Sequence, residues 1–301
     1  MPVLTVDSLS KKYGSLRALH NVSFGLDEGE AYGCIGPNGA GKTTAIRVIL
    51  GILRPSGGST SVFGMDSWKN AADIHKRIAY VPGEVNLWPN LTGGEIIDFF
   101  LSLRGKGASP NKEKRDSLIE RFKLEPGKKC RAYSKGNRQK VALVAAFASE
   151  AELYILDEPT SGLDPLMAQV FGECVKELKA DGKSILLSSH ILSEVERLCD
   201  RIGILRGGVL VEEGRLGELR HLTRTSVSVT TEHPAHGLAA IPGVHNLSVN
   251  KDCCDFSADS EYLPEIIGFL SPLRITRLTS SPPSLETLFL SHYNNSRPEE
   301  L

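Results

Sequence analysis

The residues best suited to chemistry in this chain form a glycine-rich segment. Residues 36–43 read Gly-Pro-Asn-Gly-Ala-Gly-Lys-Thr, which matches the phosphate-binding loop pattern at each of its fixed positions. Glycine lets consecutive backbone N–H groups curl around phosphate oxygens, and a helix starting near Lys42 adds a partial charge of about +0.5 at its N-terminus. Lys42 would reach the β- and γ-phosphates of a nucleotide, and the Thr43 hydroxyl would ligate Mg²⁺. The residues predicted to bind the nucleotide are Gly36, Pro37, Asn38, Gly39, Ala40, Gly41, Lys42, Thr43 and Thr44.

A pair of carboxylates follows an apolar run further along the chain. Leu153–Leu156 lead directly into Asp157 and Glu158. Open α/β sheets carry their functional groups at the carboxyl ends of buried strands. We therefore expect Asp157 to hold Mg²⁺, directly or through a water, and Glu158 to polarise an attacking water.

Three apolar runs and one long helical stretch would position these groups. Ala31–Ile35, Leu153–Leu156 and Ile185–Leu187 are continuous apolar runs of strand length, which is typical of buried strands in a mostly parallel sheet. Residues 92–149 follow a helical pattern that opens with a capping box of Thr92 and Glu95. The fold class is therefore α/β, with a helical subdomain inserted at about 92–149.

Composition excludes several classes of protein. The chain has 301 residues, of which 41% are hydrophobic and 24% charged, and its net charge is −1. This length favours two domains, and the charge argues against a protein that coats nucleic acid. The longest apolar run, Val141–Ala148, falls short of the ~20 residues that a membrane helix needs. The N-terminus lacks a signal-peptide pattern, and the six cysteines form no CxxC pair, so we expect reduced thiols in the cytosol.

A shift in charge near residue 221 predicts the domain boundary. Residues 1–221 hold 30 basic and 27 acidic residues, whereas residues 222–301 hold 5 and 9. The second part has the pattern of a small α+β domain. Its expected strands are Ser226–Thr230, Leu247–Asn250, Asp255–Ala258 and Arg274–Thr279, and its expected helices are Pro264–Leu270 and Ser284–Leu290. Asp252, Asp255 and Asp259 lack the glycine and glutamate of a calcium loop, so we expect no metal there.

Further motifs give the first part a family resemblance. Tyr13 lies in Lys-Lys-Tyr-Gly, residues 133–139 read Tyr-Ser-Lys-Gly-Asn-Arg-Gln, residues 161–164 read Ser-Gly-Leu-Asp, and His190 follows an apolar strand. In this order, and together with the phosphate loop and the acidic strand end, they resemble the nucleotide-binding subunit of an ATP-binding cassette (ABC) transporter. The resemblance covers about residues 3–221 and implies a P-loop NTPase core with a helical signature subdomain.

The resemblance also implies roles for individual residues. Tyr13 would stack on the adenine of ATP, Asp164 of the D-loop would be an ATP-binding residue, and Glu158 and His190 would be catalytic. The signature segment would contact the γ-phosphate bound by a second copy, so that ATP closes a homodimer head to tail. The signature residues are Ser134, Lys135, Gly136 and Asn137, and we expect Ser134 to begin a helix that runs through Ala148.

The expected function follows from the same resemblance. The second part resembles the C-terminal accessory domain of drug-export ATPases, whose last helix carries a similar Ser-Leu-Glu-x-x-Phe-Leu. This favours an ATPase subunit that powers an exporter through a separate membrane permease, lies peripherally on the cytoplasmic side of the cell membrane, and binds no nucleic acid. The alternative is a soluble ABC ATPase that acts on ribosomes, DNA or cluster assembly.

One departure from the family concerns a short segment that precedes the predicted helical subdomain. Residues 80–84 read Tyr-Val-Pro-Gly-Glu, with Gly83 where the family usually carries a glutamine that ligates Mg²⁺ and links the site to the permease. Glu84 could substitute, although neighbours on an extended segment point apart. The hypothesis we favour is coupling through movement of the loop backbone.

Two surface features remain open to more than one interpretation. Val85–Leu91, which includes Trp88, is either ordinary packing of the helical subdomain or a groove for a permease helix. Residues 104–140 hold 13 basic and 4 acidic residues, which suits either a solvated face or a surface close to an anionic membrane leaflet.

Overall fold

The structure is a computed structural model that describes residues 2–103, 111–221, 224–250 and 253–281. It divides into two compact units, Met1–Glu213 and Gly214–Leu301, and each is described here by itself. This boundary lies earlier than the 221/222 expected from charge. The two boundaries rest on different properties. The charge shift marks where acidic residues begin to outnumber basic ones, whereas the contacts place the short helix α8 (Leu216–His221) in the second unit.

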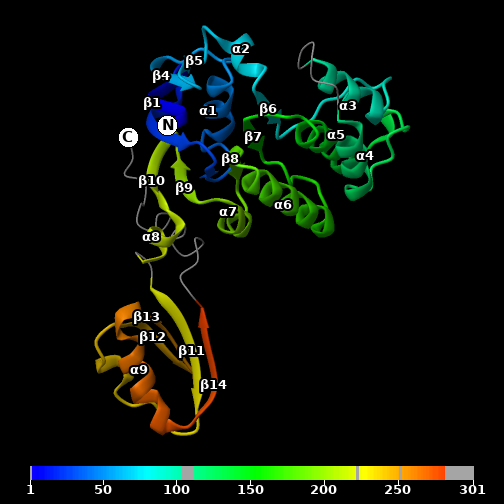
Figure 1. The fold of residues 1–301 in the computed structure, drawn as a ribbon. Coiled ribbons are helices and arrows are strands. Elements are labelled where there is room, and N and C mark those ends of the chain that lie inside the picture. The colour runs from blue at the N-terminus through cyan, green and yellow to red at the C-terminus, as the bar shows by residue number, and fades with distance from the viewer. Residues whose placement is uncertain (1, 104–110, 222–223, 251–252, 282–301) are drawn as a thin grey trace. The chain divides into compact units, whose positions relative to one another are not determined.

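The first unit is built around a six-stranded sheet with the order β10-β9-β3-β8-β7-β6 (Figure 1). β3 pairs in parallel with β8 and β9, and β7 pairs in parallel with β6 and β8. The strands predicted at 31–35, 153–156 and 185–187 are confirmed and lie side by side in the sheet. All three are buried on both faces, which explains why their sequences are continuously apolar. The strands are β3 (Ala31–Ile35), β6 (Ile78–Val81), β7 (Leu153–Asp157), β8 (Ser184–Ser189), β9 (Arg201–Arg206) and β10 (Val209–Arg215).

A second, four-stranded sheet with the order β2-β1-β4-β5 was not predicted from the sequence. β1 pairs antiparallel with both β2 and β4, and register shifts interrupt both ladders. The shifts break the strict alternation of apolar and polar residues that identifies a half-buried strand. The strands are β1 (Pro2–Tyr13), β2 (Leu16–Asp27), β4 (Gly57–Val62) and β5 (Met65–Asp66).

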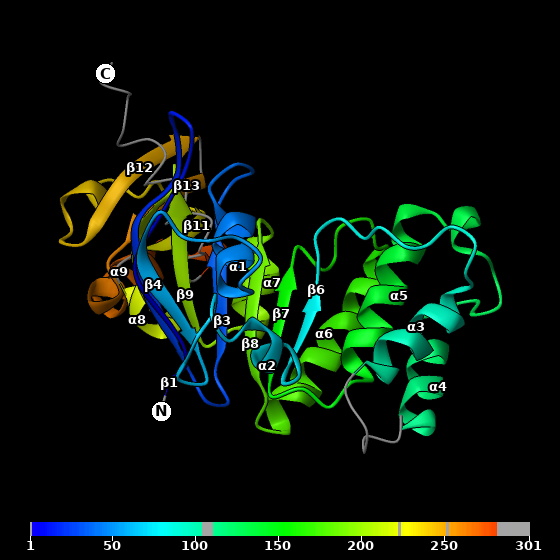
Figure 2. The same ribbon diagram turned by 90° about the horizontal axis from the view of Figure 1, so that it is seen from above.

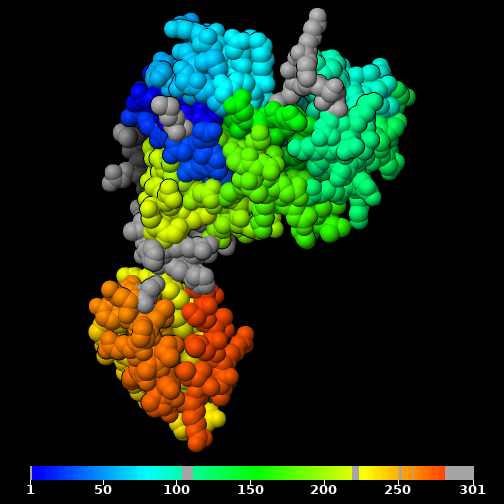
Figure 3. Space-filling view, in the orientation of Figure 1, coloured from blue at the N-terminus to red at the C-terminus, as the bar shows by residue number. Residues whose placement is uncertain are grey.

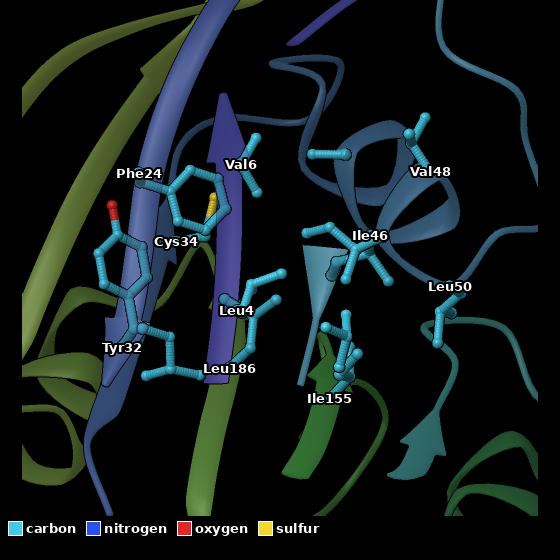
Figure 4. Close-up of a cluster of buried hydrophobic side chains, with 14 of the residues drawn as sticks. Leu4, Val6, Phe24, Tyr32, Cys34, Ile46, Val48, Leu50, Ile155 and Leu186 are labelled. Atoms are coloured by element: carbon cyan, nitrogen blue, oxygen red, sulfur yellow. The ribbon is translucent and has the colours of Figure 1, made fainter. Parts of the chain in front are cut away.

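The main core lies where helix α1 (Lys42–Ile49) packs between the two sheets (Figure 4). α1 contacts β1, β2 and β4 of one sheet and β7 of the other. The Phe24 ring stacks on Tyr32 with 4.9 Å between ring centroids, which joins β2 to β3. This packing holds the N-terminus of α1 at the carboxyl end of β3.

The predicted helical subdomain lies beyond the edge strand β6 (Figure 2). The capping box of Thr92 and Glu95 is confirmed, with both reciprocal hydrogen bonds present. Residues 104–110 of the basic stretch lie outside the described residues. The helices are α3 (Gly93–Ser102), α4 (Lys112–Arg121), the 3₁₀ turn Cys130–Ala132 and α5 (Lys135–Phe147), and the short helix α2 (Ala71–His75) precedes β6.

Two further helices complete the first unit. α6 (Pro165–Ala180) and α7 (Leu192–Leu198) pack against each other and against β8, and α7 also contacts β3. Phe171 of α6 is fully buried and lies 5.9 Å, between ring centroids, from Phe147 of α5. This aromatic contact ties the helical subdomain to the core.

The second unit is an antiparallel sheet with the order β12-β13-β11-β14, one face of which is covered by helix α9. Val227, Val229 and Phe256 of the sheet pack against Ile266 and Leu270 of the helix. The four strands and the helix expected at 264–270 are therefore confirmed, whereas the helix expected at 284–290 and Asp252 lie outside the described residues. The elements are β11 (Thr225–Thr231), β12 (Val244–Asn250), β13 (Cys253–Ala258), α9 (Leu263–Leu270) and β14 (Ile275–Ser281).

Candidate active site

The phosphate-binding loop joins β3 to α1 and requires glycine for steric reasons. A Cβ at Gly36 would lie 2.2 Å from the carbonyl oxygen of Leu205, so the loop backbone sits directly on β9. Gly41 has φ of +108°, and a Cβ there would lie 2.7 Å from the carbonyl oxygen of Ala18 on β2. A side chain at either position would push the loop away from the strands that support it. Asn38 and Gly39 form the exposed tip, and Thr44 is half-buried on α1.

Lys42 lies under this loop with its ammonium held by three oxygens. Nζ donates to the carbonyl oxygens of Gly36 and Pro37 at 2.6 and 3.2 Å, and it lies 3.2 Å from Oε1 of Glu158. The side chain is only 5% exposed. The charge is therefore held in a low-dielectric site, where it acts more strongly on a nearby anion than it would in water.

A group of oxygens lies beside Lys42 at the ends of β7 and β8. The Thr43 hydroxyl donates to Oδ2 of Asp157 at 2.8 Å, and the Ser188 hydroxyl donates to Oδ1 of the same carboxylate. Thr43 and Asp157 are thus brought together although 114 positions separate them in the chain. A hydroxyl and a carboxylate are hard oxygen ligands of the kind that Mg²⁺ takes alongside phosphates and waters, so the two residues fit this ion.

Glu158 and His190 meet in front of this group. Oε2 of Glu158 contacts Nδ1 of His190, and the backbone N–H of Glu158 donates to the carbonyl oxygen of Ser188 at 3.0 Å. Glu158 has φ of +47°, an uncommon conformation for a residue with a Cβ. Strained backbone of this kind clusters at functional sites. Here it brings the carboxylate between Lys42 and His190, whose side chain is 51% exposed.

The signature segment lies at the start of α5, where it packs against the segment that follows Glu158. Ser134 is the N-cap of α5, as expected, and its hydroxyl accepts from the backbone N–H of Asn137 at 3.2 Å. Lys135 Nζ donates to the Ser161 hydroxyl at 2.9 Å. A Cβ at Gly136 would lie 2.3 Å from the carbonyl oxygen of Gly162. The start of α5 is therefore fitted closely onto the segment that follows Glu158.

Two predicted binding residues lie apart from the phosphate loop. Asp164 is the N-cap of α6 and accepts from the backbone N–H of Met167 at 3.0 Å. Tyr13, at the end of β1, is exposed, and the Lys11 ammonium lies 5.2 Å from the centroid of its ring. Within the described parts of the chain, no hydrogen bond or ion pair joins residues 134–137, Asp164 or Tyr13 to Lys42.

Comparison with known proteins supports this arrangement of motifs. Residues 19–161 match the family described as ABC transporter. The chain is 32% identical over 296 residues to the uncharacterized ABC transporter ATP-binding protein YhaQ of Bacillus subtilis. The alignment covers 96% of this chain and 97% of the relative. It is 30% identical over 303 aligned residues to the linearmycin resistance ATP-binding protein LnrL of the same organism, with coverage of 96% and 97%. The chain belongs to the ABC transporter family of ATP-binding proteins.

The fold agrees with this assignment. A dimeric structure of the bacterial ABC transporter cassette MJ0796 matches with a TM-score of 0.66 and 26% identity, and covers 71% of this chain and 98% of that chain. The protein is accordingly an ATP-binding and ATP-hydrolysing ABC subunit with a P-loop core. In the part of the chain that the structure describes, no helix is long and apolar enough to cross a membrane.

The structure clarifies the departure at Gly83 of this ABC ATPase. A Cβ at Gly83 would lie 3.7 Å from Oδ2 of Asp157 and 3.6 Å from Cβ of Glu158, which is ordinary contact distance. Position 83 therefore faces the oxygen group, and the site has room for a side chain there. Glu84 is exposed. The geometry thus favours Gly83, and not Glu84, as the position from which a ligand would reach the site.

Sequence analysis missed Ser188, and it included Ser161 in the motif at 161–164 without predicting the contact that Ser161 makes. Ser188 orients the Asp157 carboxylate, and Ser161 receives Lys135. The signal for Ser188 was a hydroxyl residue at the end of an otherwise apolar strand, two positions before His190. Ser161 offered no comparable signal, because its partner lies on a helix that precedes it by 26 positions.

Removing the close fit at the start of α5 should impair turnover. In Gly136→Ala, the new methyl group would force α5 and the segment after Glu158 apart. We expect kcat for ATP hydrolysis to fall about 10-fold, since small displacements of catalytic groups are costly. Affinity of a single copy for ATP should stay unchanged, because Gly136 makes no contact with the phosphate loop of its own chain and would act on the nucleotide held by the second copy. Steady-state ATPase assays and equilibrium binding of a fluorescent ATP analogue measure the two quantities.

Gly127→Ala is the matched control for this variant. Gly127 is exposed, and a Cβ there would meet no atom within 4 Å. Its kcat should equal that of the unmodified chain. Equal turnover by Gly136→Ala and Gly127→Ala would show that the close fit plays no part in hydrolysis.

Proposed function

We propose that this ABC ATPase powers export through a separate membrane permease, with ATP bound between two copies of the chain. The observation that carries the proposal is the convergence of Lys42, Thr43, Asp157, Glu158 and His190 at one sheet edge. Among the described residues, no hydrogen bond or ion pair joins the signature residues to Lys42, and Lys135 is bonded to Ser161 instead. One copy then holds the nucleotide, and a second copy must supply the signature.

Hydrolysis uses the groups at the sheet edge as follows. Lys42 binds the β- and γ-phosphates, and Thr43 and Asp157 are the residues that would hold Mg²⁺. The ion would supply positive charge to neutralise the phosphate oxygens. Glu158 accepts a proton from the attacking water, and His190 holds the Glu158 carboxylate in place through their direct contact. Tyr13 stacks on the adenine, and Asp164 fixes the start of α6.

The second copy completes the site through the start of its α5. The free N–H groups of a helix N-terminus and the Ser134 hydroxyl form an anion site, which suits a γ-phosphate. Gly136 and Asn137 belong to the same first turn, whereas Lys135 acts within its own chain on Ser161. The dimeric MJ0796 cassette supports this assembly. ATP then favours the closed dimer because it binds that state preferentially.

Replacing the proposed general base should separate binding from hydrolysis. Glu158→Gln keeps the shape of the side chain and removes its basicity, so kcat should fall about 100-fold or more. Affinity for ATP should persist, and the variant should accumulate as a dimer in saturating Mg-ATP, as measured by analytical ultracentrifugation. Glu150→Gln, at an exposed position, is the control. Unreduced turnover would refute the role of Glu158, and a monomer in saturating ATP would refute the shared site.

A glutamine at position 83 should alter the requirement for Mg²⁺. Because position 83 faces Asp157, Gly83→Gln would bring an amide oxygen to the ion. We expect half-maximal ATPase activity at a lower Mg²⁺ concentration than in the unmodified chain. Gly83→Leu, of similar size and without an oxygen, should show no such decrease. An unchanged Mg²⁺ dependence in Gly83→Gln would mean that the position does not reach the ion.

A groove beside this loop is the proposed docking site for the permease. It encloses about 450 Å³ between α2, β6, α3 and α5, and Tyr80, Leu87 and Phe100 are among its lining residues. The surfaces of α2 and of the helical subdomain flank it in Figure 3. Trp88 lies in edge contact with Phe99, 5.4 Å between ring centroids, and both rings are exposed. Exposed aromatic residues beside an apolar groove suit a short cytoplasmic helix of a membrane protein.

Export, and a place at the cytoplasmic face of the membrane, are part of the same proposal. The relative that confers linearmycin resistance aligns with both units of this chain, and not with the cassette alone. We assign the second unit, 222–301 in the sequence-based division, to support or regulation of the dimer. No nucleic-acid partner is proposed, because the chain as a whole carries a net charge of only −1.

Removing the aromatic anchor should weaken docking without affecting ATP hydrolysis. When the tagged chain is purified from detergent-solubilised membranes of its own cells, the unmodified protein should bring down a polytopic membrane protein. Trp88→Ala should lose most of it. Trp68→Ala is the control, because Trp68 is 46% exposed and Trp88 is 50% exposed. Recovery of ribosomes or DNA in place of a membrane protein would overturn the proposal of export.

A further inference from the structure

A buried carboxyl group lies behind the catalytic residues and takes no part in the mechanism described so far. Glu194, on α7, is 8% exposed. Burial raises the pKa of its carboxyl group, while hydrogen bonds from Thr160 and Ser189 act in the opposite direction. Burying such a group is costly unless hydrogen bonds compensate it, so its contacts explain why it can lie there.

One oxygen of Glu194 bridges two chain segments. Oε2 accepts a hydrogen bond from the Thr160 hydroxyl at 3.1 Å and another from the Ser189 hydroxyl at 3.2 Å. Both hydroxyl residues are themselves buried. The two donors come from segments that lie 29 positions apart in the chain and that the pairing of β7 with β8 brings together.

Each of these segments carries one member of the proposed catalytic pair. Thr160 follows Glu158 by two residues, and Ser189 directly precedes His190. The Ser189 hydroxyl also accepts from the backbone N–H of Ile191 at 2.9 Å. The chain is thereby held on both sides of His190, with the Ser189 oxygen connecting that turn to Glu194.

Adjacent serines at the end of β8 serve different carboxylates. Side chains of successive strand residues point to opposite faces of a sheet. Ser188 donates to Asp157 on the side of the nucleotide site, and Ser189 donates to Glu194 on α7. The catalytic edge is thus supported from both faces of the sheet.

From this geometry we propose that Glu194 is a positioning residue for ATP hydrolysis. By accepting one hydrogen bond from Thr160 and one from Ser189, it holds the segments of Glu158 and His190 at a fixed separation, so that the two side chains stay in contact. The inference rests on the catalytic roles proposed above for Glu158 and His190. Glu194 itself touches neither phosphate nor water in this mechanism.

The test compares three replacements in the full-length chain. Glu194→Gln keeps an oxygen that can accept both hydrogen bonds, and Glu194→Leu has similar size without one. We expect Glu194→Leu to lower kcat about 10-fold with KM for ATP within about two-fold, since the loss falls on positioning and not on binding. Glu194→Gln should keep kcat within about three-fold. Glu173→Leu, at a half-exposed carboxylate on α6, controls for the loss of a charge.

A structural role would give a different result. If Glu194 only stabilised the fold, Glu194→Leu would reduce the fraction of protein that binds ATP, and kcat per binding site would be unchanged. Rates are therefore divided by the binding-competent fraction, titrated with a fluorescent ATP analogue. A kcat per site within two-fold of the unmodified chain would overturn the inference. So would a Glu194→Gln variant as impaired as Glu194→Leu, because the amide still accepts both bonds.

Two donor variants keep the inference testable should Glu194→Leu not fold. Thr160→Val and Ser189→Ala each remove one hydroxyl from the bridge, and each should lower kcat per site by several-fold. Their combination with Glu194→Leu should cost no more than Glu194→Leu alone, because partners in one network are not additive. Full turnover in both donor variants would overturn the inference.

Glu158→Gln separates this inference from the proposal on which it rests. If Glu158→Gln is inactive and Glu194→Leu is fully active per site, only the role of Glu194 is refuted. If Glu158→Gln retains full turnover, the proposed catalytic pair and the role of Glu194 both fail.

Discussion

Parallel pairing of β3, β8 and β7 is the constraint on which the active site depends. Ile35 pairs with Ser189, and Ser188 pairs with Asp157, so the three strands end at the same level. The residues that follow them emerge together at one edge of the sheet, although 114 positions separate Thr43 from Asp157 and 32 separate Glu158 from His190. The phosphate loop, the carboxylates and His190 therefore meet because backbone hydrogen bonds fix the register of strands that are buried on both faces.

The polar groups at this edge are arranged in two layers. On the nucleotide side, Thr43 and Ser188 donate to Asp157, which keeps its carboxylate oriented as a hard ligand. On the α7 side, Glu194 accepts hydrogen bonds from Thr160 and Ser189, which lie next to the catalytic pair in the chain. Buried polar groups are costly when unpaired, so the hydrogen bonds to Asp157 and to Glu194 favour one arrangement of the side chains at this edge. The chemistry is thus supported by hydrogen bonds that never reach the nucleotide.

Close backbone contact connects this edge to the surface offered to a second copy. Gly136 packs against Gly162, and Lys135 donates to Ser161, so the start of α5 is in direct contact with the segment after Glu158. A family signature with glycine at position 135 could not make the second contact. In the proposed dimer, a displacement of the signature residues would therefore shift residues 161–162, which follow the catalytic Glu158 by three and four positions. Packing contacts would in this way connect the two nucleotide sites of the homodimer.

Local sequence determined a great deal of this protein. The phosphate-loop motif, the buried strands β3, β7 and β8, the capping box at Thr92 and the start of α5 at Ser134 were predicted, because each leaves a recognisable pattern within a short stretch of sequence. The β1-β2-β4-β5 sheet, the bridge from Lys135 to Ser161, the orientation of Gly83 toward Asp157 and the burial of Glu194 were decided only by tertiary structure. These features depend on which distant backbone or side chain arrives beside a residue, and periodicity along one segment carries no information about that.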